Sequence, residues 1–363
     1  MTFKSLFNQF KHILFLLKKK GIRYTYNYLH FALLFDTKNP FLIKLLYWLK
    51  PYPSYIEIEV TTRCNLECII CEHTYWKEKN RDISFAEFKN IVDQFPKLKW
   101  IGLTGIGESF LNKDFLKMLR YVKEKNIFVE LYENFYLIDE NIARELVEME
   151  IDKILVSFDA ATKETYEKIR VNSNFERVIK NVKNLLRLKK EKRAYFPEIA
   201  FHFIINKLNI SEISQYIDLV HSITQGEKTT IQFTRMLHKF SEINNLFTEV
   251  PENIIQDTER KAKEIKNIEI TWNTDVPRFK PSLDKCTKWT MPFIFVTGHV
   301  IPCCVGNEAN RRDFQKETAL GNVFEQNFKE IWYGEKYEIL RKMLRQGKVP
   351  LACKNCSVYE TKR

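Results

Sequence analysis

The sequence predicts an α/β fold: an incomplete barrel of six parallel strand–helix units, preceded by a helical segment and followed by a small cysteine-bearing domain. From Tyr55 onward, short apolar runs alternate with longer amphipathic stretches, which is the sequence sign of a parallel sheet. Beyond about residue 240 that alternation stops, and a region with five of the eight cysteines begins. We therefore expect a helical extension over residues 1–50, a barrel over 51–240 and a C-terminal domain over 241–363.

The predicted barrel elements follow one another in strict alternation. Strands are expected at 55–60, 99–104, 127–132, 153–158, 198–205 and 229–234. Helices are expected from Phe85 onward, then at about 113–125, 139–149, 174–190 and 211–222, with another near 252–266. Ser84 and Glu87 are placed to form a capping box at the start of the first of these helices. Six right-handed units leave a lateral opening, unlike a closed eight-stranded barrel, and functional side chains are expected at the carboxyl ends of the strands.

Length and cysteine usage restrict the class of protein. A chain of 363 residues can bury one large α/β core and a smaller second one. Eight cysteines without a secretory signal indicate a reducing compartment and metal ligation in preference to disulfides. The apolar run from Ile13 to Leu17 is far too short to span a bilayer. These features predict a cytoplasmic protein, soluble or peripheral at a membrane.

The positive charge is concentrated at the N-terminus. Residues 1–50 hold nine lysines and arginines against one acid, Asp36, so +8 of the formal +12 lies there. Apolar residues recur at helical spacing in the same segment, at Phe3, Phe7, Phe10, Leu14 and Leu17. A basic, aromatic-rich amphipathic segment suits an anionic membrane surface, and it also suits a helical cap with solvated lysines. Because no recognised RNA-binding module accompanies the charge, a nucleic-acid partner is not expected.

Three cysteines directly after the first predicted strand are the strongest functional signal. Cys64, Cys68 and Cys71 have the spacing C-x3-C-x2-C. Three thiolates on one short loop can hold three corners of an iron–sulfur cube and leave the fourth iron open to a small molecule. The alternatives are three unrelated cysteines or a zinc site, although zinc normally takes four ligands in paired spacing.

This loop resembles the signature of the radical S-adenosylmethionine (SAM) superfamily. The resemblance implies a [4Fe–4S] cluster whose open iron binds the amino and carboxylate groups of SAM. It also implies that one electron from the cluster cleaves SAM to methionine and a 5′-deoxyadenosyl radical. The family usually has an aromatic residue before the last cysteine, covering the adenine, whereas this chain has Ile70.

The same resemblance assigns SAM contacts to the ends of the next three strands. Gly105, Gly107 and Glu108 resemble the family's glycine–glutamate motif beside the methionine amino group, with Ser109 in place of the usual proline. Asn134 matches one position of a common Thr-Asn-Gly turn. The remaining candidates are Ser157 or Asp159 for the ribose hydroxyls, and Arg170 for the SAM carboxylate. The alternative for Arg170 is a surface pair with Glu167.

The C-terminal cysteines resemble the auxiliary-cluster domains of the SPASM/twitch group. The resemblance rests on Cys286, Gly298, Cys303 and the pair Cys353 and Cys356, together with Leu320-Gly-Asn322 and Ile331-Trp-Tyr-Gly334. It implies a second [4Fe–4S] cluster on Cys286, Cys303, Cys353 and Cys356, and the shorter single-cluster twitch form is expected from the number of cysteines. Four cysteines also satisfy a structural zinc ion. Cys304 is surplus: either a bystander beside the cluster, or a thiol that donates hydrogen to a substrate radical.

Three functions from different classes remain open on the sequence alone. The first is an oxidative radical SAM enzyme acting on a small or lipid-linked substrate, such as a sugar, a polyol or a lipid headgroup, with the auxiliary cluster transferring electrons. A reducing donor of the flavodoxin or ferredoxin type is the implied protein partner. The second is a peptide-modifying maturase of the same superfamily. The third is a zinc-stabilised interaction protein without catalytic activity.

Overall fold

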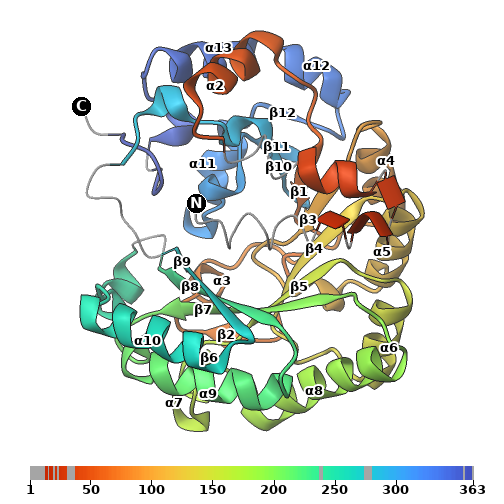
Figure 1. The fold of residues 1–363 in the computed structure, drawn as a ribbon. Helices are drawn as coiled ribbons and strands as arrows, with labels where there is room; N and C mark the ends of the chain where they lie inside the picture. The colour runs from red at the N-terminus through yellow and green to blue at the C-terminus, as the bar shows by residue number, and fades with distance from the viewer. Residues whose placement is uncertain are drawn as a thin grey trace.

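The computed structural model describes residues 13–14, 16–18, 21–22, 24–30, 37–236, 240–273, 280–354 and 356–361. Its centre is one mostly parallel sheet with the order β12-β11-β10-β1-β3-β4-β5-β7-β8-β9 (Figure 1). The barrel strands are β1 (Tyr55–Ile58), β3 (Trp100–Leu103), β4 (Phe128–Glu133), β5 (Lys153–Ser157), β7 (Glu198–Ile205), β8 (Thr229–Arg235) and β9 (Ile268–Asn273). Each pairs in parallel with its neighbour. The predicted α/β fold with a parallel sheet is confirmed.

The helices between these strands cover the outer face of the curved sheet. They are α4 (Phe85–Asp93), α5 (Phe115–Glu124), α6 (Glu140–Glu148), α7 (Lys163–Ile169), α8 (Phe175–Glu191), α9 (Ile213–Thr224) and α10 (Glu252–Ile265). The expected capping box at the start of α4 is present, because the Ser84 hydroxyl accepts from the Glu87 amide and the Glu87 carboxylate accepts from the Ser84 amide. Outward-facing strand residues and the inner helix faces form the main apolar core.

Two parts of the sheet go beyond the six predicted strands. β9 adds a seventh parallel strand beside β8. At the other edge, β10 (Phe293–Ile294) pairs in parallel with β1, and β11 (His299–Ile301) and β12 (Gly321–Asn322) continue antiparallel from it. The C-terminal domain is therefore joined to the barrel through the edge of the same sheet.

The C-terminal domain is completed by three helices, of which two lie at the upper edge of the molecule in Figure 1 and the first along the chain lies closer to its centre. They are α11 (Arg312–Glu317), α12 (Phe328–Tyr333) and α13 (Glu335–Arg345). The N-terminal helix α2 (Pro40–Leu49) packs here and not on the barrel, because its Tyr47 ring stacks on Trp289 at 5.2 Å between centroids. Lys50, which ends α2, pairs with Glu338 of α13 at 2.7 Å.

Described residues before α2 cover the amino-terminal end of the barrel. The hydroxyl of Tyr24 donates to Asp152 Oδ1 at 2.6 Å, and Leu16 and Tyr24 are buried among Tyr55, Trp100 and Phe128, the first residues of β1, β3 and β4. This is the arrangement expected of a helical cap. The predicted helical positions Phe3, Phe7 and Phe10, and the cations Lys19, Lys20 and Arg23, lie outside the described residues. Within the described part of the chain, no helix is long and apolar enough to cross a membrane.

Candidate functional site

The three N-terminal cysteines lie on the loop that follows β1, at the carboxyl end of the barrel. Cys68 belongs to the short strand β2 (Glu67–Cys68), which pairs antiparallel with β6 (Arg170–Val171) so that Cys68 lies opposite Arg170. The loop is tied internally, because the Thr74 hydroxyl donates to the Cys68 carbonyl at 2.7 Å and the Cys71 amide donates to the same carbonyl at 3.0 Å. The sequence thus fixes the cysteines on a loop that is held by β6, which begins a hundred residues later in the chain.

The three thiols are close enough to influence one another. Burial raises the pKa of Cys64 and of Cys71 to about 12, and each also feels the charge of Cys68. Burial likewise raises the pKa of Cys68, partly opposed by Arg170. Thiols in such surroundings stay protonated unless a metal drives their deprotonation. In the described residues, no group of three His, Cys, Asp or Glu side chains is gathered to hold a single metal ion.

The loop after β3 passes directly beneath the cysteine loop, and its glycines make this close approach possible. A Cβ atom at Gly107 would lie 2.4 Å from the Thr61 carbonyl oxygen, and one at Gly105 would lie 2.6 Å from Glu59 Cγ. Any larger residue would push the two loops apart. The amide of Glu108 then donates to the Arg63 carbonyl at 2.8 Å, which fixes the glycine–glutamate turn against the residue before Cys64.

Two buried carboxyl groups meet below this turn. Glu108 and Glu133, the last residue of β4, are 4% and 1% exposed. Glu108 Oε2 accepts from the Asn134 amide at 3.1 Å, and the Glu133 carboxyl group lies within hydrogen-bond reach of Glu108 and of Ser109. Burial raises the pKa of both groups, and the neighbouring Glu108 charge raises that of Glu133 further. A cationic ligand group is the natural complement of such a pair.

Asn134 and Arg170 reach the same region from β4 and β6. Asn134 Nδ2 donates to Asn65 Oδ1 at 3.0 Å, so this side chain holds the cysteine loop directly. Arg170 Nη2 pairs with Asp159 Oδ2 at 2.6 Å, and Asp159 Oδ1 also accepts from the Ile204 amide at 2.7 Å. Burial disfavours the charged Arg170, but the Asp159 carboxylate, together with Cys68 and Tyr166, raises the pKa of Arg170 above its usual range. Arg170 Nε remains without a partner.

Glu167, the alternative partner of Arg170, bonds a backbone amide instead: its Oε1 accepts from the Phe175 amide at 3.1 Å. Ser157 ends β5, opposite His202 in the register of β5 and β7.

Ile70 packs against a small apolar cluster from the segment after β8, which contains Met236, Phe240 and Ile243. That segment also meets α3 (Glu72–Tyr75) and the residue after it, with the Trp76 and Phe240 rings 4.9 Å apart in a T-shaped arrangement.

The C-terminal cysteines form a second group. The pKa of each of Cys286, Cys303 and Cys353 is raised by burial and by the charge of other members of the set Cys286, Cys303, Cys353 and Cys356. A cavity of about 40 Å³ is lined by Cys303, Cys353 and Cys356. The Tyr47 hydroxyl of α2 donates to the Cys286 carbonyl at 2.9 Å, and the Tyr359 amide donates to Cys356 Sγ at 3.4 Å. Three thiols therefore line one small space, and Cys286 lies close enough to them to affect their pKa values.

Cys304 has different surroundings from Cys303. Its thiol faces the Glu57 carboxylate of β1, and burial together with that negative charge raises the pKa of Cys304 well above the usual range. Glu57 is 8% exposed and accepts from the Tyr55 hydroxyl at 2.6 Å. Cys304 thus points toward the lumen of the barrel, beside the second cysteine group.

One segment joins the two cysteine groups. It runs from Cys303 to α11, and the Ala309 amide donates to the carboxylate of Glu72, the residue after Cys71. Arg312, 3% exposed, pairs with Glu59 Oε1 at 2.9 Å and places its guanidinium 3.9 Å from the Phe295 ring centroid. Lys316 and Arg312 both contact Glu78, at 2.9 Å and 3.3 Å. These contacts therefore connect the barrel and the C-terminal domain in the space between the two cysteine groups.

Comparison with known proteins decides the family. Residues 58–220 match the radical SAM superfamily, and residues 286–357 match SPASM, an iron–sulfur cluster-binding domain. The chain is a radical SAM protein with a C-terminal SPASM domain. The family expected from the cysteine spacing is thereby confirmed, while the single-cluster twitch form stays a prediction.

Relatives of this radical SAM protein act on different substrates. The tungsten-containing aldehyde ferredoxin oxidoreductase cofactor-modifying protein of Pyrococcus furiosus is 25% identical over 85% of this chain and 88% of its own length. The AdoMet-dependent heme synthase of Methanosarcina barkeri is 24% identical over 84% of this chain and 88% of its own length. The mycofactocin maturase MftC of Mycolicibacterium smegmatis is 22% identical over 46% of this chain and 41% of its own length.

Solved structures show the fold of this radical SAM protein. SuiB of Streptococcus suis, bound to S-adenosylmethionine, matches with a TM-score of 0.64 and 16% identity over 95% of this chain and 86% of SuiB. The enzyme anSMEcpe with bound AdoMet matches with a TM-score of 0.59 and 19% identity over 84% and 83% of the two chains.

Sequence reasoning missed several residues of the candidate site. Glu133 carried a usable signal, because it is a carboxylate at the carboxyl end of a predicted parallel strand. Met236 and Phe240 gave no such signal, since they belong to a segment after β8 that meets Ile70 only in three dimensions. Arg312 was missed for the same reason: its partner Glu59 lies 253 residues earlier in the chain.

Proposed function

We propose that this radical SAM enzyme binds SAM over the Cys64, Cys68 and Cys71 loop and removes hydrogen from a substrate, as the first step of an oxidation. The observation that carries the proposal is charge complementarity around the loop. The buried carboxyl groups of Glu108 and Glu133 lie side by side, and the buried guanidinium of Arg170 keeps Nε unpaired. These groups match the ammonium and the carboxylate of a bound amino acid.

The residues present fit an iron–sulfur cluster and SAM. Cys64, Cys68 and Cys71 would hold the cluster, and when bound it supplies the electron that splits SAM into methionine and a 5′-deoxyadenosyl radical. Glu108 and Glu133 would receive the ammonium group, with Gly105 and Gly107 allowing the backbone to come close. Arg170 would bind the SAM carboxylate. Asn134 would hold the cysteine loop in place through Asn65.

The residues that would contact the ribose and the adenine are the remaining neighbours of the cysteine loop. Both oxygens of Asp159 are already engaged, one by Arg170 and one by the Ile204 amide. Ser157 is therefore the better candidate for a ribose hydroxyl, and Asp159 acts by orienting Arg170. Ile70, with Met236 and Phe240 beside it, would provide an apolar wall for the adenine in place of the aromatic residue usual in the family.

The second cysteine group supports an oxidative outcome. Cys286, Cys303, Cys353 and Cys356 would saturate one auxiliary cluster, and a saturated cluster transfers electrons but offers no iron to a substrate. The substrate first loses one hydrogen atom and then one electron and one proton, so the product contains two hydrogens fewer than the substrate. The electron then passes to an external one-electron carrier of the flavodoxin or ferredoxin type. Sugars, polyols and lipid headgroups have C–H bonds beside hydroxyl groups that suit this change.

A peptide substrate is the second candidate. The similarity to the maturase MftC over 169 residues favours it. Both candidates use the same SAM site, so they differ only in what enters the opening of the barrel.

A substrate-class experiment tests the proposal. The reconstituted enzyme with SAM and dithionite is incubated with a lipid extract, a polar metabolite extract or a peptide fraction, and 5′-deoxyadenosine is measured against the enzyme alone. The proposal expects the lipid or the metabolite fraction to accelerate 5′-deoxyadenosine formation and to yield a product two hydrogens lighter. Acceleration by the peptide fraction alone would move the assignment to a peptide maturase. No 5′-deoxyadenosine with any fraction would reject the SAM chemistry itself.

A further inference from the structure

Helix α2 is apolar on every side. Its ten residues are Pro-Phe-Leu-Ile-Lys-Leu-Leu-Tyr-Trp-Leu, and Lys44 is the one charged residue among them. A helix of this composition is normally buried all round. The inner face follows that rule: Ile43, Leu46 and Tyr47 are buried against the SPASM domain. The Tyr47–Cys286 hydrogen bond and the Lys50–Glu338 ion pair fix the helix in this orientation.

The outer face of α2 is instead exposed to solvent. Phe41 is 71% exposed, Trp48 is 75% exposed and Leu49 is 54% exposed. Phe41 and Trp48 are seven residues apart, which is two helical turns, so they project from the same side of α2. Single exposed apolar residues are ordinary, but two large aromatic rings and a leucine on one short helix mark an interaction surface.

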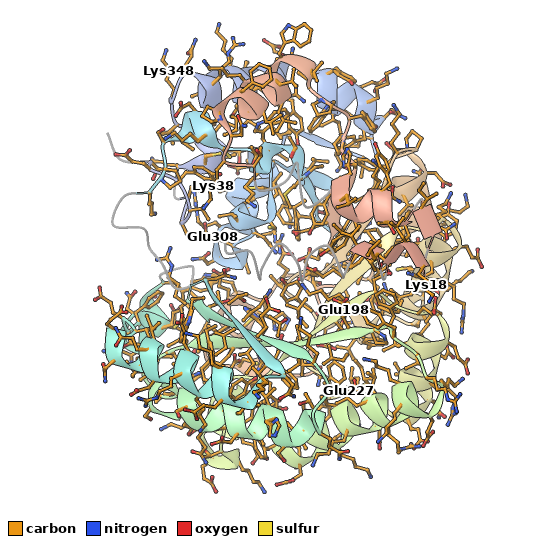
Figure 2. The ribbon with its side chains drawn as sticks, viewed as in Figure 1. Lys18, Lys38, Glu198, Glu227, Glu308 and Lys348 are labelled. Atoms are coloured by element: carbon orange, nitrogen blue, oxygen red, sulfur yellow. The ribbon has the colours of Figure 1, made fainter. Side chains whose placement is uncertain are left out.

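The charge around this surface is positive. Helix α2 and Lys50, the residue after it, contain the two cations Lys44 and Lys50 and no acid. A groove between α2 and α13 is lined by the cations Lys50, Arg341, Lys342 and Arg345 against the acids Glu335 and Glu338, of which Glu338 is paired with Lys50. The exposed Lys348 follows the end of α13, and Figure 2 shows it on the upper side of the molecule, whereas Glu198 and Glu227 lie with the barrel below. The surface therefore favours an anionic partner.

We infer that the outer face of α2, defined by Phe41, Trp48 and Leu49 with the surrounding cations, docks on an anionic lipid bilayer. Figure 1 places α2 and α13 at the outer edge of the molecule, where a flat surface can approach them. Aromatic rings and leucine insert at the headgroup boundary, and lysine and arginine stems reach along the apolar surface toward lipid phosphates. Because no helix in the described part of the chain spans a bilayer, the helix would lie on the membrane surface.

This docking would bring the SPASM domain to the membrane, because α2 is bonded to Cys286 itself through Tyr47. The inference is independent of the SAM chemistry: it rests on exposure and charge at α2, and it holds for the protein without clusters or SAM. If the docking and the proposed SAM chemistry are both correct, the enzyme meets its substrate at a membrane surface, which favours a lipid-linked substrate over a freely diffusing one.

Vesicle binding by the full-length protein tests the inference. Sedimentation is compared with neutral phosphatidylcholine vesicles and with vesicles containing phosphatidylglycerol, at low and at physiological salt. Binding to the anionic vesicles is expected, and it should weaken as salt shortens the Debye length from about 30 Å at 0.01 M to about 8 Å at 0.15 M. F41S/W48S should weaken binding about tenfold or more, because two rings no longer insert. K44Q/K342Q/R345Q should weaken it chiefly at low salt.

Matched controls separate the surface from general charge and hydrophobicity. Lys263→Gln on α10 removes an exposed cation, and Tyr195→Ser removes a ring that is 40% exposed beyond α8; both should bind vesicles as the native protein does. The difference in fluorescence between the native protein and W48F isolates Trp48, and it should shift to the blue on anionic vesicles.

Several results would overturn the inference. Equal binding by F41S/W48S and the native protein would do so, as would unchanged Trp48 fluorescence. So would an absence of vesicle binding together with a concentration-dependent dimer that F41S/W48S abolishes, because the face would then be covered by a second copy of the chain. Binding of an acidic protein by the same face, without vesicle binding, would also reject the bilayer.

Discussion

Arg312 of α11 and Glu59 at the end of β1 form a buried ion pair of 2.9 Å that joins the SPASM domain to the barrel. Glu59 also accepts from the Ile106 amide, in the glycine–glutamate turn, and from the Val296 amide, after β10, each at 3.3 Å. A single carboxylate thus fixes the glycine–glutamate turn, the edge of the sheet and helix α11 relative to one another.

Removing one partner of this pair should be costly for stability. Arg312→Leu leaves the Glu59 charge buried without its cation, which typically destabilises a protein by about 3–5 kcal/mol. Urea unfolding of the ligand-free protein measures the loss. The double variant E59Q/R312L should recover part of it, because no buried charge then remains unpaired. Lys89→Gln, which breaks the exposed Lys89–Asp93 pair, is the control and should have no measurable effect on stability. If R312L loses no more stability than this control, the Arg312–Glu59 pair does not stabilise the contact between the two domains.

Glu133 should lower stability in the ligand-free protein and assist SAM binding. Its carboxyl group is 1% exposed and lies against the second buried carboxyl group, Glu108. Burial raises the pKa of Glu133 well above the unfolded value, so its contribution to folding is greatest below pH 4.5 and falls as pH rises through the folded pKa. Glu133→Gln should therefore raise the unfolding midpoint of the ligand-free protein, more at pH 8 than at pH 5.

The same variant should bind SAM about tenfold more weakly, because the ammonium loses one carboxylate. Equilibrium dialysis with labelled SAM on the cluster-loaded protein measures this. Glu140→Gln, an exposed carboxylate at the start of α6, is the control and should change neither quantity. A destabilised E133Q protein with unchanged SAM affinity would mean that Glu133 is held by the fold and not by the ligand.

The N-terminal cysteine loop should be essential for SAM cleavage and separable from the auxiliary site. Changing Cys64, Cys68 and Cys71 to alanine should reduce 5′-deoxyadenosine formation to background after dithionite reduction. The variant should still keep about half of the iron, on the assumption of two cubane clusters. Undiminished 5′-deoxyadenosine would contradict the assignment of this loop.

Much of the barrel could be predicted because its signals are local. The runs that became β1, β3, β4, β5, β7 and β8 are short, apolar and bounded by turn residues, and the cysteine spacing lies within eight residues of the chain. β9 alternates buried and exposed positions as a half-covered edge strand does, so its signal was present but weaker. β10 is only two residues long, and it forms by pairing in parallel with the edge of β1, so the segment itself has no strand pattern to detect.

The rest depends on contacts that no local pattern encodes. Ser157 or Asp159 was expected to contact the ribose. The partners of Asp159, Arg170 and the Ile204 amide, come from different strands and together use both of its oxygens, which no local pattern indicates. The N-terminal segment was expected either to bind a membrane or to cap the barrel. The structure divides it: Tyr24 closes the barrel, and α2 covers the SPASM domain with its outer face exposed.

The choice of Cys303 over Cys304 as a cluster ligand gives the sharpest test of the C-terminal site. Cys303 lines the small cavity with Cys353 and Cys356, whereas the Cys304 thiol faces Glu57 in the barrel. Cys303→Ala should therefore lower the iron content of fully reconstituted protein from about eight to about four atoms per chain, while Cys304→Ala should leave it near eight. Both variants should keep the SAM-cleaving cluster, so the 5′-deoxyadenosine made without substrate serves as their common control. If the two alanine variants lose iron equally, Cys304 shares the coordination; if zinc fills the site and native protein holds about four irons, the second cluster is rejected.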